Sequence, residues 1–208
     1  EYLGVILSVR STYLGVFDEQ IKIVNDKLTL YEIEGFEINQ DEAIKSFFEY
    51  YKLNIPAIPL LPQEFSNPLF LSIFSQTYQN ASIDARVLSN ISLIEIFKKF
   101  VDRINNVLAK RNGYENMGNA VVFFIQKFAE ITLKERRGYL IQVEIRKLIK
   151  TIKDEFCFTS NFIEELLSEN ILVKDIKIIS NEEIYLLSYE RLLDYAQAMY
   201  ILTKYKDE

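Results

Sequence analysis

Apolar residues recur at intervals of three and four along much of the chain, and this spacing constrains the fold more than any other feature. Residues 92–110 carry the clearest apolar stripe: Ile96, Phe97, Phe100, Val101, Ile104 and Leu108. A helix with such a stripe buries one face against a core and leaves the other face to water. Similar patterns predict helices at 120–135 and 144–154, and a last helix at 189–205 closes the chain.

Short polar motifs predict where further helices begin. Asn39 precedes an apolar periodic segment, and Glu42 completes a pattern that resembles a capping box. In the run 66–68 a cap candidate precedes Pro68, at an early helical position where a missing N–H costs nothing. Residues 159–161 predict a cap for a helix at 162–167.

Strand patterns are few. Residues 3–9 form an apolar run typical of a buried strand, and residues 27–33 alternate as a half-buried strand does. Near the end, residues 171–173 and 183–187 predict a hairpin that follows three helices, which is the order of elements in a winged helix. The expected fold is therefore mainly α with a small β component, in three regions: 1–38, 39–113 and 114–208.

The composition excludes several classes of catalytic site. The chain has no histidine, which excludes serine–histidine and cysteine–histidine nucleophiles and histidine-based zinc sites. The sequence holds neither a Gly-x-x-x-x-Gly-Lys-Ser/Thr loop nor a Gly-x-Gly-x-x-Gly motif. Adjacent carboxylates such as Glu164 and Glu165 do not face each other on a helix and indicate solvated surface. We therefore expect no catalytic residue and no metal ligand.

Charge and cysteine content indicate a compartment and disfavour one class of partner. A net charge of -6 and a pI near 5.0 make general binding to nucleic acid unfavourable. The single cysteine, Cys157, fits a reducing compartment and a buried apolar position. With no apolar run long enough to span a membrane and no signal-peptide pattern, we expect a cytoplasmic protein without membrane contact.

Three motifs, in this order, resemble the STAND-type P-loop ATPases, the signalling NTPases that include the NB-ARC and NACHT proteins. Residues 5–10, Val-Ile-Leu-Ser-Val-Arg, resemble the sensor strand of that family. Residues 65–71, Phe-Ser-Asn-Pro-Leu-Phe-Leu, resemble the proline-containing helix start of its lid domain. Residues 184–195 resemble the segment that leaves its winged-helix domain. The pattern is frequent in large bacterial members, several of which act in antiphage defence.

The resemblance implies a domain plan and a set of partners. Residues 1–38 would be a remnant of the ATPase α/β core, residues 39–113 the helical lid, and residues 114–208 a winged-helix-like domain plus a C-terminal helix. The Walker A and Walker B elements would lie before Glu1, in an upstream P-loop core of the same protein. ATP or ADP with Mg would bind that intact protein, which would oligomerise on activation. This chain alone would neither hold nucleotide tightly nor hydrolyse ATP.

The resemblance also implies nucleotide contacts. Arg10 would read the terminal phosphate, and Asn67 and Pro68 would lie near the adenine. Many family members place a winged-helix histidine against the phosphate, so Tyr189 or Arg191 would have to take that role here. Simpler roles remain open: an ion pair for Arg10, helix capping for Asn67 and Pro68, and packing on the wing for the segment 189–191.

Two other functions compete with this interpretation. The first is a winged-helix nucleic-acid binder, whose recognition helix at 160–168 carries Glu164 and Glu165 and no Lys or Arg. Basic residues do gather nearby, at Lys134, Arg136, Arg137, Arg146, Lys147, Lys150 and Lys153. A solvated helix face would also explain that gathering. The second alternative is a helical protein-interaction module without a ligand.

Overall fold

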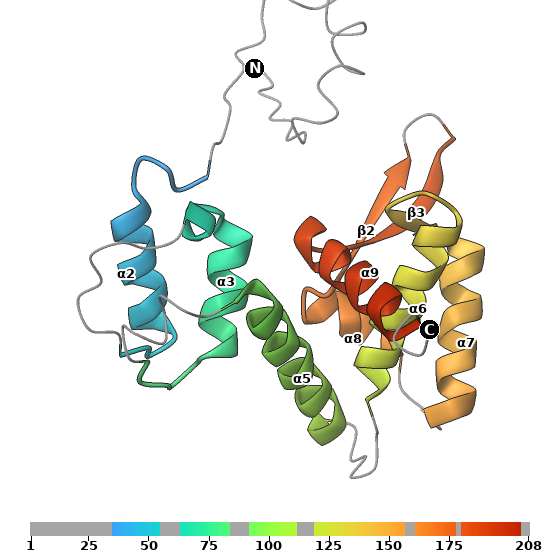
Figure 1. Ribbon diagram of the computed structural model, residues 1–208, viewed down its shortest axis with the longest axis horizontal. Coiled ribbons are helices and arrows are strands. Elements are labelled where there is room, and N and C mark those ends of the chain that lie inside the picture. Colours follow the sequence, from blue (N-terminus) through green and yellow to red (C-terminus); the bar gives the residue numbers. More distant parts are fainter. Residues whose placement is uncertain are drawn as a thin grey trace, which may run out of the picture.

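The computed structural model describes residues 35–54, 63–83, 92–111, 119–156, 161–177 and 180–204, and it confirms a mainly α fold with a small sheet (Figure 1). The elements in chain order are α2 (Gln40–Tyr50), the 3-10 helix η2 (Gln63–Ser66), α3 (Pro68–Thr77), α5 (Leu93–Arg111), α6 (Ala120–Lys134), β1 (Tyr139–Ile141), α7 (Gln142–Phe156), α8 (Phe162–Ser168), β2 (Leu172–Lys177), β3 (Glu182–Leu187) and α9 (Glu190–Lys204). The strands predicted at 3–9 and 27–33, with Arg10, lie outside the described residues.

The first part of the molecule packs α2, η2, α3 and α5 through aromatic side chains. The ring of Phe65 lies edge-on to the rings of Phe70 and Phe74, at centroid distances of 5.4 and 4.9 Å. Phe48 of α2 meets Phe74 of α3 at 6.1 Å. Edge-to-face pairs of this kind add to the free energy gained by burying the rings. Phe70 and Phe74 are 1% exposed, so they lie at the centre of this part.

The second part has the predicted three helices followed by a hairpin. Strands β2 and β3 pair antiparallel from Leu172 opposite Leu187 to Lys177 opposite Glu182, so the hairpin is longer than the sequence predicted. β1 adds to the other edge of β3, giving the strand order β1-β3-β2. The sequence did not predict β1, because a three-residue strand is too short for alternation to be recognised. Within the part of the chain described here, no helix is long and apolar enough to cross a membrane.

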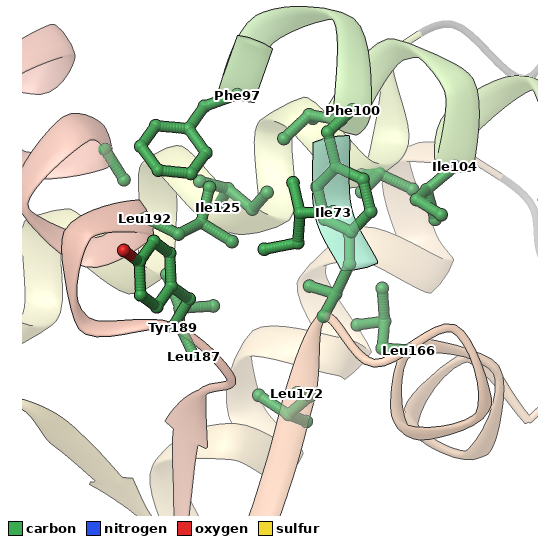
Figure 2. Packing of buried hydrophobic residues seen from close by; sticks show 14 of the residues in the cluster. Ile73, Phe97, Phe100, Ile104, Ile125, Leu166, Leu172, Leu187, Tyr189 and Leu192 are labelled. Atoms are coloured by element: carbon green, nitrogen blue, oxygen red, sulfur yellow. The ribbon is translucent and has the colours of Figure 1, made fainter. Parts of the chain in front are cut away.

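One hydrophobic core joins the two parts. Figure 2 shows Phe97, Phe100 and Ile104 of α5 beside residues of α6, the hairpin and α9. The predicted stripe of α5 is buried from Ile96 to Leu108, as its spacing required. α9 packs against α6, where Gln197 Nε2 donates to Thr132 Oγ1 at 3.1 Å. α9 also meets α5, where the ring of Tyr195 lies 5.8 Å from that of Phe97.

Asn39 occupies its predicted N-cap position, before α2, without capping through its side chain, and the same holds before α8 for Asn161, the one described residue of the run 159–161. An N-cap residue adopts extended dihedral angles, whereas Asn39 has φ -122° and ψ 33°. The backbone N–H of Asn39 donates to Phe36 O at 3.0 Å, so Glu42 closes no capping box.

A buried asparagine of α5 supplies the cap that α6 lacks. Asn119, at the N-cap position of α6, makes no side-chain cap. Asn105 Oδ1 instead accepts from the backbone N–H of Val121, at 3.1 Å. Asn105 is 7% exposed and Val121 is fully buried, so water cannot replace this acceptor. A single side chain therefore completes the first turn of α6 and fixes its position against α5.

Replacing Asn105 with Leu should lower the free energy of unfolding by about 1–3 kcal/mol, because the buried N–H of Val121 then loses its acceptor. Urea denaturation followed by circular dichroism measures the change. Asn106→Leu is the matched control, since Asn106 is the exposed neighbour on the same helix. Equal effects at the two positions would contradict the role given to Asn105.

Candidate functional site

Two segments far apart in the sequence meet at the start of α3 and the start of α9. Arg191 Nη1 lies 3.3 Å from Glu64 Oε1, across 127 residues of sequence. The ring of Tyr189 lies 6.3 Å from that of Phe70 and 5.8 Å from that of Phe97. We call these five residues the seam. The seam places Arg191 against η2 and Tyr189 against α3, the two helices on either side of Asn67.

Tyr189 is the buried side of the seam. It is 8% exposed, and Figure 2 shows its ring lying among the core residues Phe97, Leu192 and Leu187. Burial raises the pKa of Tyr189, while the positive charge of Arg191 lowers the pKa and the negative charge of Glu64 raises it. The hydroxyl is therefore neutral at physiological pH. It can donate or accept one hydrogen bond, but it carries no charge for a phosphate.

Arg191 and Glu64 form the exposed side of the seam. Their side chains are 52% and 29% exposed, so water screens the pair. An ion pair this exposed contributes about 0–1 kcal/mol. Its main effect is on geometry, because it holds the start of α9 beside η2. Arg191 has one recorded partner among the described residues, and its exposed guanidinium could exchange that carboxylate for another anion.

The predicted capping role of Asn67 and Pro68 is confirmed. Asn67 is extended, with φ -81° and ψ 117°, and its Oδ1 accepts from the N–H groups of Leu69 and Phe70 at 3.0 Å each. Pro68 occupies the first turn of α3, where a backbone N–H would have no partner within the helix, so its missing N–H costs no hydrogen bond. The side-chain oxygen of Asn67 is thus used within α3. Contact of Asn67 or Pro68 with adenine stays a prediction.

The chain entering from the N-terminal side is held against the same helix start. The backbone N–H of Phe36 donates to Ser66 O at 2.7 Å. A Cβ at Gly35 would lie 2.6 Å from Ser66 O and 3.6 Å from Pro68 Cδ. Only glycine allows so close an approach without moving the backbone. Residues 35–36 therefore lie directly beside the predicted site residues Asn67 and Pro68.

The structure brings four of the five predicted site residues into one region. Asn67 and Pro68 begin α3, while Tyr189 and Arg191 contact residues three positions away from Asn67 on either side. Arg10 lies outside the described residues, so its place is not tested. Sequence reasoning missed Glu64 and assigned Phe97 only to the core. Phe97 was identifiable from its stripe, but nothing in the sequence pairs Glu64 with Arg191.

The seam can hold two elements together, and its groups are of the kinds that bind a partner by noncovalent contacts. Its groups are three aromatic rings, one carboxylate and one guanidinium. Across the described ranges, no three side chains of the metal-binding types gather in one place. Comparison with protein-family models, with curated proteins and with solved structures found no match to the chain.

Replacing Asn67 with Ala should lower the free energy of unfolding by about 1 kcal/mol, because two N–H groups of α3 lose their acceptor. Thermal unfolding followed by circular dichroism measures the shift. Asn39→Ala is the control, since Asn39 occupies an N-cap position but makes no side-chain cap. A larger loss at Asn39 than at Asn67 would show that the capping geometry is wrong.

Stability should fall at alkaline pH in part through Tyr189. Burial raises the pKa of Tyr189 in the folded chain, whereas the unfolded chain ionises at the ordinary value of about 10. As pH rises past that value the unfolded state ionises first, which lowers its free energy relative to the folded state and so reduces stability. Tyr189→Phe keeps the ring and removes the titration, so it should lose less stability between pH 9 and 11 in urea titrations. A loss identical to that of the unmodified chain would contradict burial of the hydroxyl.

Proposed function

We propose that this chain is the nucleotide-sensing, regulatory portion of a STAND signalling ATPase, without catalytic activity of its own. The seam is the observation that carries the proposal. In the resemblance, residues 65–71 begin the lid and residues 184–195 leave the winged-helix domain. Those two segments lie against each other, although nothing in their sequence spacing requires it. A switch between two arrangements of these units would keep this contact in one arrangement and open it in the other.

In the proposed mechanism the intact protein binds ADP, or ATP with Mg, on an upstream P-loop core. Arg10 would read the terminal phosphate, and Pro68 would shape the adenine pocket beside Asn67. Asn67 Oδ1 already accepts hydrogen bonds from two backbone N–H groups. Neighbouring groups, rather than that oxygen, would therefore contact the adenine. The protein would act in the cytoplasm.

The seam gives the switch a physical basis. A ligand shifts an equilibrium only as far as its contacts differ between the two arrangements. Arg191 offers such a difference, since a half-exposed guanidinium can bind either Glu64 or a phosphate. Separation of the seam would also expose Tyr189 and Phe70, which are 8% and 1% exposed. Exposed aromatic rings of this kind favour association with other copies, as oligomerisation on activation requires.

The acidic surface of α8 weakens the nucleic-acid alternative. α8 takes the position of a recognition helix, yet Glu164 and Glu165 lie in its first turn and Glu164 is exposed. Carboxylates there repel the phosphates of a duplex. One observation favours the interaction-module alternative. Asn67 and Tyr189 are already used in contacts within the chain, which leaves them less available to a nucleotide. Nucleotide binding by the intact protein separates it from the proposal.

In the intact protein, which includes the P-loop core, Arg191→Gln should change the dissociation rate of fluorescent ADP by up to about fivefold, the equivalent of one exposed ion pair. Glu64→Gln should change the rate in the opposite direction, because it frees Arg191 for the phosphate, and the double variant should resemble Arg191→Gln. Lys134→Gln is the control, since it removes an exposed pair with Glu130 on α6. Stopped-flow fluorescence measures the rates.

Two results would contradict the proposal. Failure of the intact protein to bind ADP or ATP would exclude nucleotide sensing. Equal dissociation rates in the unmodified, Arg191→Gln and Glu64→Gln proteins would exclude the seam as part of the switch.

A further inference from the structure

The outer face of α7 carries a basic stripe in a chain whose net charge is -6. Arg146, Lys147 and Lys150 are exposed and Lys153 is half-buried. No ion pair is recorded for these four side chains among the described residues, whereas Lys127, Lys134 and Lys174 each bind a carboxylate. We call the four residues the basic face. A helix rises 1.5 Å per residue, so the basic face extends over about 10 Å.

Two exposed apolar side chains adjoin the basic face. Val143, at the start of α7, is 57% exposed, and Ile176 of β2 is 52% exposed. Ile176 pairs with Glu183 across the hairpin, and Gln142, the residue before Val143, donates to Glu183 Oε2 at 2.9 Å, so the start of α7 lies against β3. Cations next to exposed valine and isoleucine suit a partner that is both acidic and apolar. Nucleic acid offers phosphates but no comparable apolar side chain.

The chain itself contains a segment with that chemistry. Ile38, just before α2, is 88% exposed, the highest value among the exposed large apolar residues. Glu37, Asp41 and Glu42 surround it, all three are exposed, and none has an ion pair recorded within the described ranges. Lys45 is the one basic residue of the helix that follows. We call residues 37–42 the acidic segment.

We propose that the acidic segment of one copy of this chain docks on the basic face of a second copy, with Ile38 against Val143 and Ile176. The carboxylates would face Lys147 and Lys150, which form no ion pair within the part of the chain that the structure describes, and Arg146, whose positive charge acts on Glu183. The proposal rests on charge and exposure alone. It depends neither on the seam nor on nucleotide binding.

The positions of the two surfaces require that the contact join different copies. α2 and α7 lie at opposite ends of the described molecule (Figure 1). One copy cannot bring its own acidic segment to its own basic face without unfolding, so the contact must join different copies. Two copies could satisfy both surfaces at once by pairing reciprocally about a two-fold axis. In any other arrangement the contact is heterologous, and each copy keeps a free surface from which a ring or an open chain of copies grows.

Sedimentation velocity of the chain without nucleotide tests the proposal. The mean sedimentation coefficient should rise with protein concentration at 50 mM salt and fall again at 500 mM salt, because screening weakens the charge contacts. The double variant Lys147→Glu with Lys150→Glu should stay monomeric, as should Asp41→Lys with Glu42→Lys. An equimolar mixture of the two variants should associate again, since opposite charges then face each other at both kinds of contact.

A second pair of variants tests the apolar contact. Ile38→Ser should weaken association by about tenfold or more, whereas Ile94→Ser should leave it unchanged, because Ile94 lies on α5 and is 58% exposed. Circular dichroism confirms that each variant is folded. A monomer at every concentration and salt would overturn the proposal, as would a mixture of charge variants that fails to associate. A third outcome would favour nucleic acid and overturn the proposal. In that outcome the chain does not self-associate but binds a 20-base-pair DNA duplex, and the variant with Lys147→Glu and Lys150→Glu loses that binding.

Discussion

The burial of one stripe of α5 holds the molecule together. Phe97 meets Phe70 of α3 and two tyrosines of the α9 region, while the same helix packs on α6 farther along. A helix that fills two interfaces with one stripe cannot shift toward one partner without opening a gap at the other. The relative position of α3, α6 and α9 thus follows from a single amphipathic pattern. Everything at the seam depends on that arrangement.

The seam combines a strong contact and a weak one, and the two have different consequences. Burial of Tyr189 between Phe70 and Phe97 supplies most of the free energy and little directionality. The pair Arg191–Glu64 supplies little free energy, yet it selects the orientation of the start of α9. Ligands compete more easily with the weak contact. Regulation by an anion would therefore act first at the charged rim and only afterwards on the rings.

Sequence reasoning predicted the helices well and the contacts between them poorly. The starts of α5, α6, α8 and α9 agree with prediction to within about one residue, because apolar spacing is a local property. Asn39 makes no side-chain cap because capping depends on dihedral angles, which the residue type does not determine. The pairing of Glu64 with Arg191 spans 127 residues and leaves no local signal. Of the candidate site, the sequence identified Asn67, Pro68, Tyr189 and Arg191, but it did not show that they adjoin.

The cap that Asn105 provides makes the secondary structure of α6 conditional on the docking of α5. Ordinarily a helix carries its own cap, and it can then move as a rigid rod. Here the acceptor for Val121 belongs to another helix, so sliding of α5 removes it from the first turn of α6. That turn would fray instead of following the movement. A displacement of α5 would therefore unfold the first turn of α6 locally, because the two helices share this hydrogen bond.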